Sequence, residues 1–118
     1  MMQLQPAFTE QALTDLSSIQ TWTEENFGLE ISQRYDALIE NALAQLLESP
    51  SRLGVQQHPA LSSEIHLFHL SFSRNSEKKR LIQSPRHFIV FRVDHDVLTV
   101  LRVLHDSMDL QSQLQASS

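Results

Sequence analysis

The segment RHFIVFRVDHDVLTVLRVLHDSMDL, residues 86–110, decides the fold of this chain. Its first part, RHFIVFRV (86–93), is apolar on both faces, as expected of a central strand. Its second part, VLTVLRVL (97–104), is rich in leucine and β-branched residues, which favour strands. Only the short stretch Asp94-His95-Asp96 separates the two parts. The segment therefore predicts two core strands joined by a tight hairpin loop.

The chain before residue 50 has helical rather than strand periodicity. Apolar residues recur at helical spacing over 10–27 and again from about 29 to 48. Thr9 offers a hydroxyl N-cap for the first of these segments, and Gly28 suits the turn that ends it. Because a single glycine separates the two segments, we expect a tight antiparallel helix hairpin.

Two further strands complete the expected order of strand, helix, helix, strand, strand, strand. Residues 2–7 give a weak strand signal, and EIHLFHLSF (64–72) alternates with Phe68, Leu70 and Phe72 in phase. The order predicts an α+β fold: an N-terminal strand and a helix hairpin packed on a mainly antiparallel sheet of three or four strands. We expect one domain over residues 1–118, with a core of about 7–110 and a flexible tail at 111–118. The expected core residues are Leu16, Ile19, Leu38, Leu46, Phe68, Leu70, Val90 and Val100.

Composition excludes several classes of protein. No apolar run approaches the ~20 residues that span a bilayer, and the N-terminus lacks the pattern of a secretory signal. The chain has no cysteine, which excludes disulfides, thiolate metal sites and a cysteine nucleophile. These features fit a cytoplasmic protein.

The distribution of charge is uneven. The net charge of −5 argues against a sequence-specific nucleic-acid binder. Residues 1–50 carry eight acids and one base, whereas residues 74–92 carry six bases and one acid. The basic segment is either a solvated loop or a docking surface for an acidic partner. Its bases are Arg74, Lys78, Lys79, Arg80, Arg86 and Arg92.

Histidines and arginines near the predicted hairpin are the candidates for chemistry. If Val93 pairs with Val97, Phe88 opposes Arg102, and His87 and His105 become diagonal neighbours on one face. With Asp106, such a pair of histidines could act as base and orienter, or could be two partly exposed rings at a sheet end. Arg102 interrupts an apolar strand and therefore needs a partner, for which we expect either Asp15 or a carboxylate of another protein. His66 and His69 should point to opposite faces of their strand, so we expect no metal site and no cofactor.

Four stretches carry a resemblance to a known family. They are ALTDLSSIQTW (12–22), SPSRLG (49–54), RHFIVFRV (86–93) and VLTVLRVLHDSMDL (97–110). In this order and spacing, over roughly residues 7–110, the chain resembles the RelE/ParE superfamily of toxins, and its ParE branch in particular. The resemblance implies the toxin of a type II toxin–antitoxin module, a role in plasmid stabilization, and a ParD-like antitoxin that binds the toxin in a hetero-oligomer. It also implies one of two targets: DNA gyrase for ParE-like members, or mRNA on the ribosome for RelE-like ones.

Individual residues favour gyrase over RNA cleavage. By strand register, the arginine that RelE-like ribonucleases carry early in the penultimate strand falls on Phe88, and their Lys-Arg pair falls on Asp106-Ser107. Both departures remove positive charge from the place where a phosphate would lie. We therefore expect no catalytic residues and a gyrase inhibitor that is not an enzyme, with a ribosome-dependent mRNA endonuclease as the alternative.

Two sets of residues are expected to bind partners. The antitoxin should contact Arg86, Arg92 and Arg102, because its acidic segment would meet the only concentrated positive charge. A separate surface for the target or another partner should include His87, His105, Asp106, Met108 and Asp109.

Overall fold

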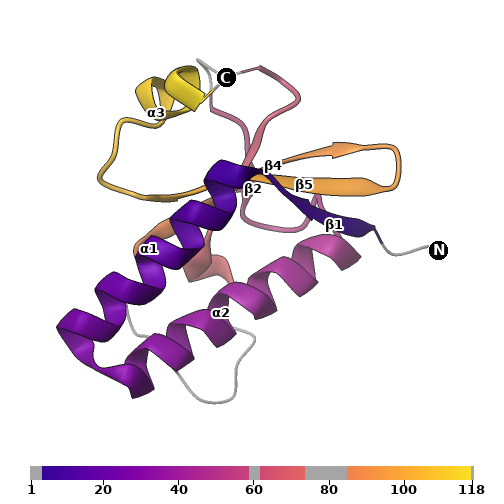
Figure 1. Cartoon of the computed structure of the whole chain (residues 1–118). Coiled ribbons are helices and arrows are strands. Elements are labelled where there is room, and N and C mark those ends of the chain that lie inside the picture. The colour runs from indigo at the N-terminus through magenta and orange to yellow at the C-terminus, as the bar shows by residue number, and fades with distance from the viewer. Residues whose placement is uncertain (1–3, 59–61, 74–84, 118) are drawn as a thin grey trace.

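A computed structural model describes residues 4–58, 62–73 and 85–117 (Figure 1). The elements are β1 (Gln5–Phe8), α1 (Glu10–Phe27), α2 (Leu29–Glu48), β2 (Val55–Gln56), β3 (His66–His69), the 3₁₀ turn η1 (Leu70–Phe72), β4 (His87–Asp94), β5 (Val97–His105) and α3 (Leu110–Ser117). The helix hairpin of α1 and α2 lies on one side of the sheet and α3 on the other. Most of the basic segment, residues 74–84, lies outside the described residues.

The helix hairpin forms where the sequence predicts it. The Thr9 hydroxyl accepts a hydrogen bond from the backbone N–H of Ala12 at 3.0 Å, as an N-cap does. Gly28 alone joins the two helices, with a φ of 92° that an L side chain rarely adopts. Local signals alone therefore set both helix boundaries.

The sheet has five strands in the order β1-β5-β4-β3-β2. β1 runs parallel to β5, and the other pairs are antiparallel. The predicted α+β class is confirmed, but the expected three or four strands become five. The additional strand, β2, has only two residues, which is too short for a period-2 pattern to be visible in the sequence.

The register of the β4–β5 hairpin differs from the expected one. Asp94, not Val93, pairs with Val97, so the turn contains only two residues, and His95 takes a φ of 56° there. A bulge between Val90 and Phe91 shifts the rest of the ladder by one more residue, which places Arg102 opposite Val90. These two shifts make the predicted pairing of Phe88 with Arg102 wrong. Neither shift could be predicted, because neither changes the hydrophobic pattern of the sequence.

Strand β3 is shorter than the predicted segment 64–72. It ends at His69, whose ring accepts a hydrogen bond from the backbone N–H of Ser71 and so caps η1. The alternation is lost there, and Phe72 is 43% exposed. Phe72 instead covers Gly54, where a Cβ atom would clash with its ring. The glycine that ends the 49–54 turn is therefore required for close packing as well as for its φ of 100°.

Side chains pack on both faces of the sheet. The larger cluster joins the helix hairpin to β3, β4 and β5, and six of the eight predicted core residues are buried in it. Of the other two, Leu16 is half-buried against the same cluster and Val90 belongs to the smaller one. The smaller cluster is formed by Leu67, Val90, Leu104, Leu110 and Leu114. The predicted flexible tail thus contains a helix, α3, that buries Leu114 against the sheet. No helix among residues 4–58, 62–73 and 85–117 is long and apolar enough to span a membrane.

Candidate functional site

The start of β4 and the end of β5 bring two predicted site residues together. His87 lies directly opposite His105, rather than diagonally, and their ring centroids are 5.2 Å apart in an edge-to-face arrangement. The backbone N–H of Asp106 donates to the carbonyl of Arg86 at 2.8 Å, which extends the pairing by one residue. This end of the hairpin therefore places Arg86, His87, His105 and Asp106 side by side.

Tyr35 of α2 determines which ring nitrogen of His87 carries the proton. The backbone N–H of Arg86 donates to the Tyr35 hydroxyl oxygen at 3.1 Å, and the hydroxyl lies 2.6 Å from Nδ1 of His87. Because the tyrosine oxygen already accepts, its proton is directed to Nδ1, and the imidazole proton sits on Nε2. Burial lowers the pKa of His87 to about 4, with a further contribution from His105. Burial also raises the pKa of Tyr35 to about 12, so both groups are neutral at pH 7.

Asp106 is the anion of the cluster. Arg86 donates to it through Nε at 3.0 Å and Nη2 at 2.9 Å, and Nε2 of His69 lies 3.0 Å from Oδ2. The hydrogen bond from Arg86 is the main reason that the pKa of Asp106 falls to about 2, and the bond from His69 adds to it. Nδ1 of His69 accepts from Ser71 N–H at 3.1 Å, so its proton is on Nε2 and points to Asp106. The charges of Arg86 and Asp106 therefore cancel within the cluster.

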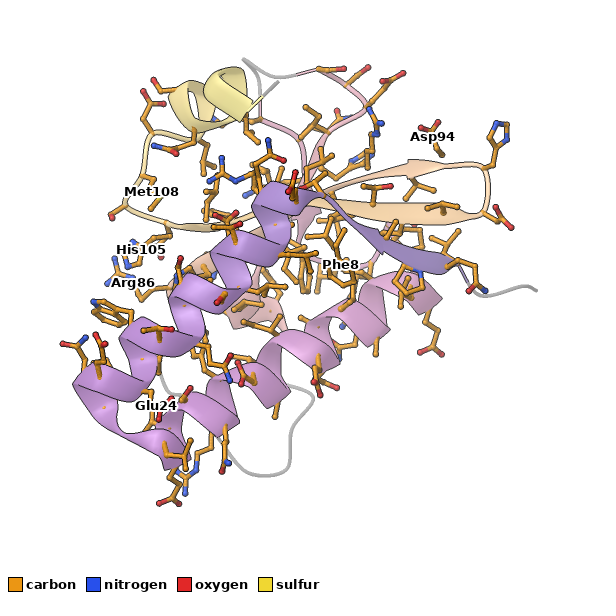
Figure 2. All side chains as sticks on the ribbon, in the orientation of Figure 1. Phe8, Glu24, Arg86, Asp94, His105 and Met108 are labelled. Carbon is orange, nitrogen blue, oxygen red and sulfur yellow. The ribbon has the colours of Figure 1, made fainter. Side chains whose placement is uncertain are left out.

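His105 borders a shallow pocket between α1 and the segment after β5. Its Nδ1 accepts from the backbone N–H of Ser107 at 3.1 Å, which again leaves the proton on Nε2. The pocket has a volume of about 360 Å³ and a mostly apolar lining. The lining residues are Ser18, Ile19, Trp22, His87, His105, Ser107 and Met108. Figure 2 shows Arg86, His105 and Met108 along the side of the molecule on which the C-terminal half of α1 lies.

This arrangement has limited means to stabilise a phosphate. Its imidazoles present N–H groups rather than free basic nitrogens, and Arg86, the one arginine in contact with the cluster among the described residues, is paired with Asp106. A transition state with developing negative charge needs unpaired positive charge or several directed donors. In the part of the chain that the structure describes, no three histidine, aspartate or glutamate side chains gather as metal ligands.

Arg102 lies away from this cluster and has a partner within the chain. Its Nε and Nη2 donate to the two carboxylate oxygens of Asp15 in α1 at 2.7 and 3.0 Å. Asp15 also accepts from the backbone N–H of Val103 at 3.0 Å, at the edge of β5 that β1 does not cover. Of the two partners predicted for Arg102, the structure therefore provides Asp15.

The other predicted residues lie in three different places. Arg92 is exposed near the tip of the β4–β5 hairpin, 3.8 Å from Asp94 and far along β4 from His87. Met108 is 45% exposed at the pocket. Asp109 accepts from the hydroxyl and the backbone N–H of Ser112 in the first turn of α3, which makes it a helix cap. The three arginines expected to bind the antitoxin thus lie apart from one another, whereas His87, His105 and Met108 of the other set line one pocket.

Sequence patterns do not place three residues of the site. Tyr35, His69 and Trp22 come from α2, β3 and α1, and reach the hairpin end only through the tertiary fold. One signal was available for Tyr35, because a buried tyrosine on an apolar helix face needs a partner for its hydroxyl. His66 and His69 do lie on opposite faces, since His66 packs near Phe91 and His69 near Phe88.

Comparisons with known proteins agree with this fold. The model of a family described as the ParE toxin of type II toxin-antitoxin system, parDE, matches residues 7–110. No curated protein matches the sequence. A chain of the chromosomal ParDE toxin–antitoxin system from P. aeruginosa superposes with a TM-score of 0.65 at 14% identity, covering 87% of this chain and 96% of that one. A chain of the E. coli DinJ-YafQ toxin–antitoxin complex gives a TM-score of 0.60 at 9% identity, covering 90% and 96%.

The family match spans nearly the whole described fold, from β1 to the first residue of α3. Because the identities to the solved structures are so low, those structures support the fold alone, and membership rests on the family match. This chain belongs to the ParE toxin family of type II toxin–antitoxin systems.

Proposed function

We propose that this protein inhibits DNA gyrase, acts in the cytoplasm and is held inactive by a ParD-like antitoxin. The observation that carries the proposal is the match to the ParE toxin family over residues 7–110. ParE-like toxins, which the chain resembles, poison gyrase rather than cut RNA. A role in plasmid stabilization follows from the same resemblance.

The geometry of the hairpin end supports a toxin that works by binding. Phe88, which stands where ribonuclease relatives carry an arginine, packs its ring edge-to-face on His69 with the centroids 4.8 Å apart. Asp106, the first residue after β5, brings a negative charge and takes up Arg86. Phe88 therefore carries no charge where a cation would be needed, and the charge of Arg86 is offset by Asp106, so neither position offers an unpaired cation to an RNA phosphate.

A second function, ribosome-dependent mRNA cleavage, is favoured by one specific observation. Tyr35, His69, His87 and His105 gather around Asp106, and these residue types carry out proton transfer in many enzymes. In this candidate the ribosome supplies the unpaired positive charge that the described residues of the hairpin end do not offer. This candidate requires that His105 or His87 touch the RNA.

Parallel assays of the purified toxin separate the two functions. Supercoiling by DNA gyrase should be inhibited in proportion to toxin, and mRNA incubated with translating ribosomes should stay intact. Leu53→Ser, at an exposed site away from the cluster and the pocket, is the matched control and should leave gyrase inhibition within about threefold of wild type. Cleavage at codon-related positions that His105→Ala abolishes, together with unaffected supercoiling, would establish the endonuclease instead.

A further inference from the structure

A continuous apolar surface with an acidic border lies on the C-terminal half of α1. Trp22 is 56% exposed and Phe27 is 59% exposed, and their rings meet edge-to-face with centroids 5.6 Å apart. Trp22 also forms a wall of the 360 Å³ pocket, whose opposite side includes Met108. We call Trp22, Phe27, Met108 and the pocket between them the Trp22 surface.

Folding gives no reason for these side chains to be apolar. The buried residues of α1 are Ala12, Ile19 and Thr23, whereas Trp22 and Phe27 are exposed and belong to neither buried cluster. The space around the adjacent turn is open, since a Cβ atom at Gly28 would have no neighbour within 4 Å. Tryptophan is enriched among the few residues that contribute most of the binding energy of protein interfaces.

The charge around the Trp22 surface selects the kind of partner. Glu25 is the neighbour of Trp22 on the surface of α1, and Glu24 lies at the same end of the helix. Both are exposed and form no ion pair with the described residues. Residues 10–48 carry eight acids against Arg34 alone, and Arg34 is paired with Glu30 at 2.6 Å. On the other side of the pocket, Arg86 and Asp106 cancel each other and His87 is neutral at pH 7. Nucleic acid and anionic lipid are therefore repelled, and a cationic segment is attracted.

We propose that the Trp22 surface is the contact of this toxin with its protein target, and that the target presents an apolar side chain flanked by lysine or arginine. The apolar side chain enters the pocket between Trp22 and Met108, and the cations lie against Glu24 and Glu25. This inference rests on the proposed function as a toxin that works by binding. An antitoxin with an acidic tail would avoid Glu24 and Glu25 and dock elsewhere, so the two partners would be sorted by charge.

Variants of the full-length toxin test the proposal in two assays run side by side. Growth arrest after induced expression reports contact with the target, and calorimetric titration with the cognate antitoxin reports the fold and the antitoxin surface. Trp22→Ser should raise the toxin level needed for half-maximal arrest about thirtyfold or more. The pair Glu24→Gln/Glu25→Gln should raise it by about fivefold, with a smaller effect at higher salt in a purified target assay. Antitoxin affinity should change by less than about twofold in both.

The control variants match the size and charge of these changes at other sites. Leu53→Ser removes an 87% exposed apolar side chain after α2, and Glu40→Gln/Glu48→Gln removes two exposed acids of α2. Both should arrest growth as wild type does. A photo-crosslinker at position 22 should capture a segment in which lysine or arginine adjoins an apolar residue.

The outcomes are distinct. Growth arrest that survives Trp22→Ser overturns the inference, as does loss of antitoxin binding in the same variant with unchanged thermal unfolding, because the surface would then belong to the antitoxin. Capture of an acidic segment, or a wild-type toxin that never arrests growth, also overturns it. Wild-type arrest without gyrase inhibition overturns the proposed function alone, while the dependence on Trp22 still supports this surface.

Discussion

Replacing Asp15 with alanine should be among the most destabilising changes of a charged residue in this protein. Asp15 and Arg102 have side chains only 14% and 15% exposed, and the carboxylate accepts three hydrogen bonds. Removing one partner of a buried pair costs about 3–5 kcal/mol, because the other charge is left without compensation. Water still reaches both groups, which lowers this cost, whereas the loss of the acceptor for Val103 N–H adds to it. We therefore expect the free energy of unfolding to fall by about 3 kcal/mol in total.

Urea unfolding followed by far-ultraviolet circular dichroism measures this change directly. The slope of unfolding free energy against urea should stay constant while the midpoint falls. For a domain of this size the same loss corresponds to a drop in Tm of about 12 °C. Asp15→Asn should lose about half as much, because its side-chain oxygen can still accept from Val103 N–H. Glu25→Ala, which removes an exposed acid of the same helix, should change stability by less than about 0.5 kcal/mol.

A double-mutant cycle with Arg102→Met separates the ion pair from the rest. Removing both charges should be less harmful than the sum of the two single changes by about 2 kcal/mol, since neither charge is then left alone. A coupling below about 0.3 kcal/mol would refute the reasoning, because Asp15 and Arg102 would then act independently despite their contacts.

Three further outcomes are expected. Phe68→Ala should cost about 3–5 kcal/mol in urea unfolding, because Phe68 is fully buried between the helix hairpin and the sheet; a cost below 1 kcal/mol would contradict this core. The pKa of His87 is lowered to about 4, so between pH 6.5 and 4 this histidine is protonated in the unfolded chain but neutral in the folded one. The free energy of unfolding should therefore fall by up to about 3 kcal/mol as the pH drops from 6.5 to 4. His87→Gln should flatten that part of the profile, and an NMR titration of His87 near 6.5 would disprove it. In antitoxin titrations across a salt series, Arg92→Glu should weaken binding most at low salt, and Arg86→Glu should weaken it less; wild-type binding by both would place the antitoxin on the helical face.

Features that depend on neighbouring residues could be predicted from the sequence, whereas features that depend on distant parts of the chain could not. The boundaries of α1 and α2 follow from Thr9, Gly28 and the helical period, all of which act within a few residues. The existence and type of β4 and β5 follow equally from composition. Where a choice depended on another part of the chain, the prediction was less successful. The bulge beside Val90 and the two-residue turn at His95 are examples, because both are settled by how the strands fit the layers above and below.

The candidate site shows the same difference between residues that are near in sequence and residues that only the tertiary fold brings together. Sequence spacing could place His87 and His105 near each other, since a hairpin joins them. It could not bring Tyr35, His69 or Trp22 to the same end, because α2, β3 and α1 meet there only after the sheet is assembled. For Arg102, by contrast, the cost of a bare buried cation was enough to name Asp15 as a candidate from sequence alone.

The intrachain pairs change how the sheet arginines can serve an antitoxin. The side chain of Arg102 is mostly buried and bound to Asp15, so an incoming carboxylate would have to replace a bidentate contact whose carboxylate also accepts from the backbone of β5. Arg86 is more exposed, yet it holds Asp106, and drawing it away would leave that carboxylate with His69 as a partner. Arg92 lies 3.8 Å from an exposed Asp94, a distance too long for a well-formed hydrogen bond, and can turn to a new partner at little cost. Of the three arginines predicted to bind the antitoxin, Arg92 has the weakest contact inside the chain and can therefore bind a carboxylate of the antitoxin most easily. Arg102 instead stabilises the fold of the toxin through its pair with Asp15.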